Sequence, residues 1–329
     1  MSVGDRVGIS RRVIIDTVRE LGSGNKAAAA LRVSRATVHA IMRETDPPKG
    51  EKPRKVDKRV ELLERHDIGA KQLKELLDPS KRKRPPFKQA KTKSVFTFGI
   101  VSDTHLCDSE CALPELQHFY QVCADEGITD VVHAGDLVTG MSVYPGQLHD
   151  LAVFGYDKQL EFAVENYPST YGITTHVIGG NHEEDYTKRA GFDMLNAIAK
   201  ERDDILYHGM YDATIKLNGV SIGLQHGARG VGYAASYPLQ RYIERIPPGE
   251  KPQIFILGHY HCSLYMFERD IHAFLPGSFM WSSNLLAKRL KLSGRPGGFI
   301  VTVTVADDKH NTITDLQFRR LTYYKRGTV

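Results

Sequence analysis

The sequence predicts an α/β fold that is preceded by a small all-α module, and two observations support this prediction. In residues 94–329, five short apolar runs rich in β-branched residues are typical of strands, and stretches with helical spacing lie among them. Glycines and polar side chains follow these runs, at the end where an α/β sheet presents its functional groups. In residues 1–45, the apolar residues recur at helical spacing instead.

The N-terminal module is predicted to contain three helices. Asn25 and Ser34 are predicted N-caps for the second and third helix, because their side chains can accept hydrogen bonds from free backbone N–H groups. Gly22-Ser23-Gly24 ends the first helix. The three helices are expected over residues 11–21, 26–31 and 35–43.

The stretch 25–41 resembles the helix-turn-helix of bacterial regulators, although Arg32 stands where that motif often has glycine. The resemblance implies DNA binding by residues 1–45, since a recognition helix presents its N-terminal residues to base edges. The side chains expected to face DNA are Arg35, Thr37, His39 and Arg43. The alternative is a small helical bundle without a DNA role, used for instance in dimerisation.

Residues 46–93 are predicted to be a basic linker that contains short helices near 56–65 and 70–77, interrupted by prolines. Residues 1–93 hold 24 lysines and arginines against 12 acidic residues, whereas residues 94–329 hold 20 against 27. Residues 1–93 therefore carry a net charge of +12 and residues 94–329 a net charge of −7, which favours a polyanionic partner for the N-terminal segment. Beside a helix-turn-helix, the run Lys81–Arg84 is expected to contact phosphates.

The elements of the body follow from local pattern. Helices are expected over 113–126, 150–166 and 192–202, and hairpins around Asn218-Gly219 and Arg269-Asp270. Residues 298–305 are a predicted late strand, and 312–324 close the sheet or cover its edge. The five strands that lead into polar motifs are expected at 95–101, 130–133, 174–178, 220–224 and 253–257.

Five polar motifs follow these strands. They are Asp103-Thr104-His105, Gly135-Asp136, Gly180-Asn181-His182-Glu183, Gln225-His226-Gly227 and Gly258-His259-Tyr260-His261. Imidazole nitrogen combined with carboxylate and amide oxygen, and without thiolate, suits Mn, Fe, Zn or Ni better than a pure oxygen site for Mg or Ca. One carboxylate can bridge two cations, and two cations can assist the in-line displacement at a phosphoryl group. The spare imidazole of His182 can protonate a leaving oxygen.

In this order, the five motifs resemble those of the calcineurin-like metallophosphoesterase family over residues of about 94–305. The resemblance implies a two-layer β-sandwich flanked by helices, with residues 94–329 as the catalytic domain. It also implies two divalent metal ions, for which Mn is expected and Fe, Zn, Ni or Mg are alternatives. One metal would be held by Asp103, His105 and His261, the other by Asn181, His226 and His259, with Asp136 bridging and His182 assisting the leaving group.

The expected reaction is the hydrolysis of phosphodiester bonds, most plausibly in nucleic acid, with a metal-bound hydroxide as the nucleophile. Thr139-Gly140 stands where protein serine/threonine phosphatases of the family carry Asp-Arg, which argues against a protein phosphatase. Two alternatives stay open. One is a small-molecule phosphatase or cyclic-nucleotide phosphodiesterase, and the other is a DNA-binding regulator with a non-catalytic metal site.

Two further segments are candidates for shaping the substrate site. Arg229 can bind a phosphate and Tyr233 can stack a base, from the glycine-rich loop that follows His226. Glu183 is expected to orient ligands from behind, whereas Glu184 and Asp185 are expected to be solvated acids.

Composition limits the setting. No apolar run approaches the ~20 residues of a membrane helix, and the N-terminus lacks a secretory apolar segment. The four cysteines lack CxxC spacing and are too few for a disulfide scaffold. We therefore expect a cytoplasmic protein with no membrane partner, with DNA favoured as nucleic-acid partner. A homodimer is a further expectation, since helix-turn-helix proteins often pair.

Overall fold

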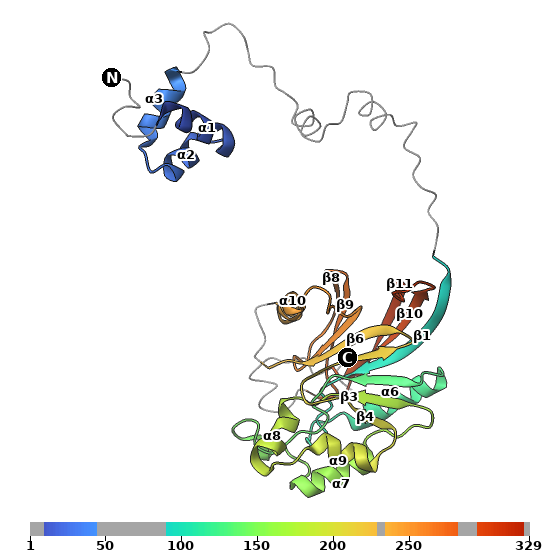
Figure 1. Ribbon diagram of the computed structural model, residues 1–329. Helices are drawn as coiled ribbons and strands as arrows, with labels where there is room; N and C mark the ends of the chain where they lie inside the picture. Colours follow the sequence, from blue (N-terminus) through green and yellow to red (C-terminus); the bar gives the residue numbers. More distant parts are fainter. Residues whose placement is uncertain (1–9, 45–89, 229–233, 282–294, 326–329) are drawn as a thin grey trace. The chain divides into compact units, whose positions relative to one another are not determined.

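The computed structural model describes residues 10–44, 90–228, 234–281 and 295–325 (Figure 1). The chain separates into two compact units, Met1–Phe87 and Lys88–Val329. The predicted linker helices and the run Lys81–Arg84 lie outside the described residues.

The described part of the first unit, residues 10–44, contains three helices: α1 (Arg11–Leu21), α2 (Gly24–Ala30) and α3 (Arg35–Glu44). Ile14, Ala28, Val38 and Ile41 form its small buried core, one or more from each helix. The predicted start of the second helix was wrong. It begins at Gly24, so Asn25 lies inside the helix, and Ser23 occupies the cap without a side-chain hydrogen bond.

The predicted cap and turn of the third helix hold, but the predicted outward position of Thr37 was wrong. The Ser34 hydroxyl accepts a hydrogen bond from Thr37 N at 3.1 Å, as an N-cap does. Arg32 has φ of 52°, a left-handed conformation that explains why glycine suits this turn. Arg35, His39 and Arg43 are exposed, whereas Thr37 is half-buried and its hydroxyl contacts Ser34 Oγ.

The second unit is a sandwich of two sheets. The first sheet has the strand order β11-β10-β1-β2-β3-β4. Strands β1 to β4 are parallel to one another, and β10 is antiparallel to both of its neighbours, β1 and β11. Its strands are β1 (Thr92–Val101), β2 (Asp130–His133), β3 (Thr174–Val177), β4 (Ile205–Tyr207), β10 (Gly297–Ala306) and β11 (Ile313–Thr322).

The second sheet has the order β5-β6-β7-β9-β8. Its strands are β5 (Asp212–Leu217), β6 (Val220–His226), β7 (Ile254–Gly258), β8 (Ser263–Glu268) and β9 (Ile271–Pro276). The β5–β6 hairpin turns at Asn218-Gly219, both with positive φ, and β8–β9 turns at Arg269-Asp270 in the same conformation. Both predicted hairpins are therefore confirmed.

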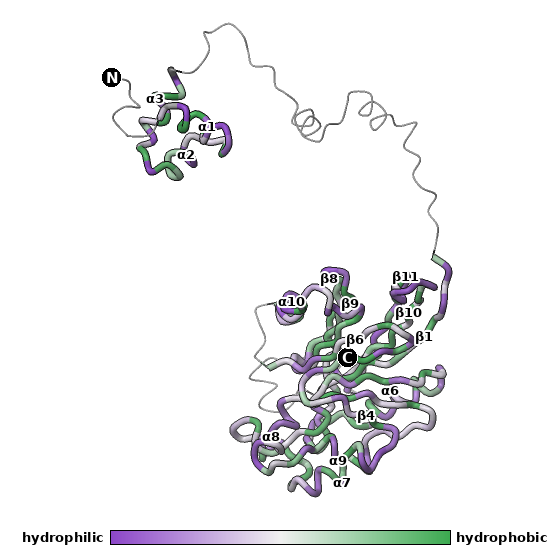
Figure 2. Tube along the Cα trace, in the orientation of Figure 1, coloured by the Kyte–Doolittle hydropathy of each residue, from purple (hydrophilic) through white to green (hydrophobic). Residues whose placement is uncertain are grey.

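Helices cover the outer faces of the two sheets. On the first sheet they are α6 (Leu113–Asp125), α7 (Tyr156–Asn166), α8 (Asn181–Ala190) and α9 (Met194–Glu201), and on the second α10 (Ser236–Arg245). Residues such as Phe98, Ile100, Ile222 and Ile256 fill the space between the sheets. Figure 2 shows apolar residues concentrated in these central strands. The predicted sandwich flanked by helices is confirmed.

Three differences from the expected elements matter for the site. The helix expected from residue 150 begins at Tyr156, after Gly155 in a left-handed conformation. Helices α8 and α10 were not predicted. Among the described residues, no helix combines the length and apolar character that crossing a bilayer requires.

Candidate metal centre

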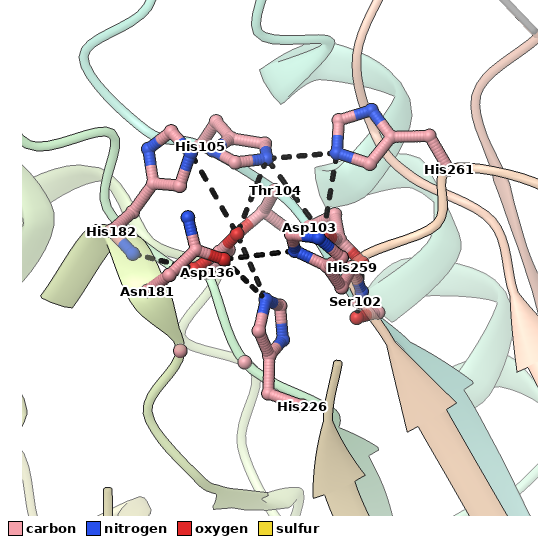
Figure 3. A network of polar contacts seen from close by, with 12 residues as sticks. Ser102, Asp103, Thr104, His105, Asp136, Asn181, His182, His226, His259 and His261 are labelled. Carbon is pink, nitrogen blue, oxygen red and sulfur yellow. Dashed lines mark hydrogen bonds and ion pairs between the residues drawn. The ribbon is translucent and has the colours of Figure 1, made fainter. Parts of the chain in front are cut away.

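The polar motifs meet where the parallel strands end, and both sheets contribute to them (Figure 3). Loops after β1 and β2 carry the first two motifs, and the third runs from Gly180 into the first turn of α8. The end of β6 and the loop after β7 carry the last two. All eight residues predicted for the site come together, and each lies in contact with at least one other. From the first sheet they are Asp103, His105, Asp136, Asn181 and His182, and from the second His226, His259 and His261.

The first donor group consists of Asp103, His105 and His261. The Nε2 atoms of His105 and His261 lie 3.1 Å apart, and His261 Nε2 lies 3.3 Å from Asp103 Oδ1. His105 Nε2 is 3.9 Å from that same oxygen. Ligand atoms bound to one cation at about 2.0–2.2 Å are separated by about 3 to 4.4 Å. The three donor atoms therefore fit one cation.

The second donor group consists of Asn181, His226 and His259, together with Asp136. His226 Nε2 lies 3.0 Å from Asp136 Oδ2 and 3.2 Å from Asn181 Oδ1, and His259 Nδ1 lies 2.9 Å from Asn181 Oδ1. His226 Nδ1 donates a proton to Ala134 O at 2.7 Å. In the neutral imidazole, Nε2 therefore carries a lone pair, which faces the oxygens of Asp136 and Asn181. A cation is the partner that this nitrogen and the two oxygens can share.

Asp136 lies between the two groups. Its Oδ2 atom is 3.0 Å from His226 Nε2, 3.8 Å from His182 Nε2 and 3.9 Å from His105 Nε2. Its Oδ1 atom accepts a hydrogen bond from His182 N at 2.9 Å. The carboxylate is thus within reach of histidines from both groups, which is the arrangement expected of a bridging ligand.

The electrostatics of the site favour bound cations. Although burial opposes ionisation, contact with His261 holds the pKa of Asp103 well below its usual range, and His226 and His182 do the same for Asp136. Burial also opposes a charge on His226, yet the Asp136 carboxylate raises its pKa to about 10. Burial and the neighbouring His226 lower the pKa of His259 to about 4. The carboxylates are therefore ionised and His259 is neutral, as ligands must be, whereas His226 carries a proton that a bound cation would displace.

Hydrogen bonds behind the candidate ligands fix their positions. Glu183 accepts from Asp136 N at 3.1 Å, Val138 N at 2.8 Å and Gly180 N at 2.8 Å, so it ties the loop after β2 to the start of α8. Burial and the Asp136 carboxylate raise the pKa of Glu183, and the N–H groups of Val138 and Gly180 oppose that shift. The prediction that Glu183 orients ligands from behind agrees with these contacts.

Two supporting residues differ from the sequence-based expectation. Asp185 is buried rather than solvated, because its Oδ2 accepts from Met141 N and Ser142 N at 3.1 Å. Ser102 was not predicted, and its hydroxyl donates to Asp103 Oδ2 at 2.5 Å. Its place directly before Asp103 was the only signal in the sequence. Glu184 is half-buried and pairs with Lys188.

Backbone strain is concentrated at the candidate ligands. Positive φ values occur at Asp103 (52°), His105 (43°), Asp136 (56°), His259 (85°) and His261 (49°). Each such conformation costs on the order of 1–3 kcal/mol in a residue other than glycine, and it persists where the surroundings enforce it. Here the surroundings include hydrogen bonds from His259 N to both oxygens of Asp103, at 3.1 and 3.0 Å.

His182 occupies the start of α8. Its Nδ1 donates to Thr139 O at 2.5 Å, which leaves Nε2 directed at the donor groups, 3.8 Å from Asp136 Oδ2. The predicted substrate residues Arg229 and Tyr233 lie outside the described residues.

The fold and this site define a two-sheet α/β protein with paired histidine–carboxylate donor groups. The model of the calcineurin-like phosphoesterase superfamily domain matches residues 96–289, more than half of the sequence, and the chain belongs to this superfamily. Membership of this superfamily supports the assignment of the protein as a metal-dependent phosphoesterase, which is a hydrolase. The donor groups provide candidate ligands for divalent metal ions.

Individual relatives are more distant. The DNA polymerase II small subunit of Halobacterium salinarum is 28% identical over 147 residues, which make up 43% of this chain and 28% of that subunit. The chain thus aligns with less than a third of that relative's length. A solved archaeal phosphodiesterase shares 17% identity at a TM-score of 0.40, over 69% of this chain and 100% of that one. Vps29 from Entamoeba histolytica, complexed with zinc, shares 14% identity at a TM-score of 0.35, over 69% of this chain and 99% of that one.

Proposed function

We propose that this protein is a two-metal phosphoesterase that hydrolyses phosphodiester bonds in nucleic acid. The observation that carries the proposal is the position of Asp136 between two donor groups, with His182 beside it. A single structural cation would need only one of the two groups. Two groups that share a carboxylate are the arrangement that phosphoryl transfer uses.

We assign one cation to Asp103, His105 and His261 and the other to Asn181, His226 and His259, with Asp136 shared. The mixed nitrogen and oxygen donors suit Mn, Fe, Zn or Ni, and we propose Mn. When bound, two such cations supply Lewis acidity and neutralise negative charge on the phosphoryl oxygens. The polypeptide contributes the position of these ligands, through the hydrogen bonds of Glu183, Ser102 and Ala134.

His182 is assigned the role of general acid. Because its Nδ1 proton is engaged by Thr139 O, the proton available for transfer is the one on Nε2, which points at the donor groups. Transfer of this proton to the leaving alkoxide would avoid the release of a strong base. The short contact with a backbone carbonyl keeps the imidazole in this orientation.

The nucleic-acid part of the proposal rests on the first 93 residues. They carry a net charge of +12, and α3 exposes Arg35, His39 and Arg43 on one short helix. A basic surface of this kind binds phosphate backbones and gives a steep dependence on salt. A curated relative named as a DNA polymerase small subunit agrees with a nucleic-acid setting.

The test compares hydrolysis of bis-p-nitrophenyl phosphate and p-nitrophenyl phosphate by metal-depleted protein reconstituted with Mn. We expect faster turnover of the diester, loss of turnover in Asp136→Asn, and a large decrease in His182→Ala. The matched control is Asp130→Asn, which removes another carboxylate paired with a histidine at 3.0 Å, away from the donor groups. This control should retain activity.

The same experiment separates the alternatives. Preference for the monoester would identify a phosphatase. Turnover of small diesters without cleavage of plasmid, single-stranded or short oligonucleotide substrates would identify a small-molecule phosphodiesterase. No turnover of any substrate, together with tight DNA binding, would identify a regulator and contradict the proposal.

A further inference from the structure

The two sheets present their edge strands β8 and β11 to each other, and side chains from both meet there. Tyr265 of β8 and Phe318 of β11 have ring centroids 4.4 Å apart. Phe267 of β8 continues the row, since it contacts His272 at 4.8 Å and His272 contacts Tyr265 at 6.1 Å. We call this row, with Arg320 at its other end, the β8–β11 seam.

Aromatic rings are exposed along the seam. Phe267 is 56% exposed and Phe318 is 42% exposed, and Tyr324, just after β11, is 53% exposed. Single exposed apolar residues are common, but a contiguous row of rings is usually a binding surface. Phe318 also packs against the buried rings of Phe274 and Phe299, so only the exposed parts of Phe318 and Phe267 are available for stacking on unpaired bases.

Two guanidinium groups lie together at one end of the seam. Arg320 Nη2 donates to Arg295 O at 2.9 Å, and the Arg295 guanidinium lies 5.3 Å from the centre of the Tyr324 ring. In the described part of the chain, neither guanidinium is paired with a carboxylate. Arg320 donates to Thr322 Oγ1 and to Arg295 O, and only its buried Nε has no hydrogen-bond partner. Burial and the charge of Arg295 lower the pKa of Arg320. An anion beside the exposed Arg295 would neutralise positive charge that no described carboxylate balances.

The neighbouring Arg319 shows the contrast. It lies on the same strand but faces the opposite side of the sheet, where it pairs with Glu126. The arginine that faces outward is therefore neutralised by the protein, and the one that faces the seam is not. This difference favours an external anion at the seam over a general excess of surface charge.

The basic end of the seam adjoins the candidate metal centre. Phe279 N donates to Asp103 O at 3.1 Å, and Gly297 N donates to Ser278 O at 3.1 Å. Gly297 in turn pairs with Thr322 of β11. Arg320 pairs with Phe299, and Phe299 pairs with Ile100, three residues before Asp103. Two strand spacings across the sheet and three residues along it are each about 10 Å, so the separation is about 14 Å, the rise of about four stacked nucleotides. A strand whose phosphate lies at the metal centre can therefore reach the seam.

We infer that the β8–β11 seam binds a single-stranded nucleic-acid segment that extends from the metal centre, with Arg295 and Arg320 on its phosphates and Phe318, Tyr265 and Phe267 against its bases. This inference rests on the proposed function, since it names the form of substrate which that site takes. Stacking on these rings requires unpaired bases, so single strands are preferred over duplex. The seam is a second nucleic-acid contact, distinct from the N-terminal unit.

The test measures fluorescence anisotropy of a short labelled single-stranded oligonucleotide with the full chain carrying Asp136→Asn, so that the oligonucleotide stays intact. Phe318→Ala should weaken binding by about fivefold to more than a hundredfold. The double variant Arg295→Gln/Arg320→Gln should lower the salt slope by about 1.4, which corresponds to two phosphate contacts. The matched controls Arg319→Gln and Tyr171→Ala, which change an arginine on the opposite face and a fully exposed ring, should bind as the parent does.

The location is checked by photocross-linking with an iododeoxyuridine oligonucleotide, which should label residues 263–268 and 313–325. Cross-links confined to residues 1–93, or unchanged affinity of the seam variants, would overturn the inference. Self-association that Phe318→Ala abolishes, with unchanged oligonucleotide binding, would show a protein contact and also overturn it. Because neither readout needs hydrolysis, an inactive protein that still binds through the seam would refute only the proposed function.

Discussion

Gly180 offers the most direct test of how closely the candidate ligands are packed. A Cβ atom at this position would lie 2.3 Å from Asp136 Oδ1 and 2.8 Å from His226 Nε2. Its φ of −143° is extended backbone that any residue adopts, so alanine introduces no left-handed strain there. The change Gly180→Ala therefore acts through one methyl group placed against two candidate ligands.

The magnitude follows from these distances. A carbon normally approaches an oxygen to about 3.3–3.6 Å, so the Asp136 carboxylate must move by about 1 Å. Overpacking of this kind costs about 1–3 kcal/mol of stability. A displacement of about 1 Å at a reacting centre lowers turnover by about a hundredfold. We expect Gly180→Ala to fold, to bind Mn more weakly and to lose most diester hydrolysis.

The assay combines calorimetric titration with Mn, turnover of bis-p-nitrophenyl phosphate and urea unfolding. Gly191→Ala, at the other end of α8, is the matched control. Its φ of 62° makes alanine cost about 1 kcal/mol, but apart from its chain neighbours no atom of the described residues lies within 4 Å of the added methyl group. The reasoning is refuted if Gly180→Ala binds Mn and turns over like the parent, or if Gly191→Ala loses as much activity.

Two further predictions concern buried groups near the centre. Glu183→Gln places an amide N–H₂ against a backbone N–H, so the free energy of unfolding in urea should fall by about 1–3 kcal/mol. The control Glu184→Gln should change the free energy of unfolding little. Equal losses in the two variants would contradict the role of Glu183. Burial lowers the pKa of His133 from 6.5 to about 4, so as the pH falls the unfolded chain takes up a proton on this residue before the folded chain does. The free energy of unfolding should therefore decrease by up to about 3 kcal/mol as the pH falls from 6.5 to about 4. His133→Gln, measured by urea unfolding at pH 6.5 and pH 4.5, should show a smaller loss than the parent, and an identical loss would exclude His133 as its source.

The strands and the candidate ligands could be predicted from sequence because their signals are local. A buried strand is a short apolar run, and β2 begins and ends at the predicted residues. Each ligand follows its strand within a few positions, so the end of the strand also fixes the place of the ligand. The hairpins carried equally local signals in two-residue turns.

Helix α8 and the burial of Asp185 could not be predicted in this way. Asp185 is buried by its bonds to Met141 N and Ser142 N, which lie 44 and 43 positions away in sequence, and no local pattern contains them. The sequence of α8 is almost entirely polar, with Tyr186 as its one buried hydrophobic side chain, so it lacks the apolar stripe that identifies a helix. The seam was missed for the same reason, since β8 and β11 meet only in three dimensions.

Each donor group takes ligands from both sheets, which has a mechanical consequence. His261 stands opposite Asp103 and His105, and His226 and His259 stand opposite Asn181. A bound cation would therefore cross-link the two sheets of the sandwich. Sliding of one layer past the other would then stretch coordination bonds as well as disturb apolar packing. A contact that shifts one sheet relative to the other, even far from the metal centre, would therefore change the geometry of the candidate ligands.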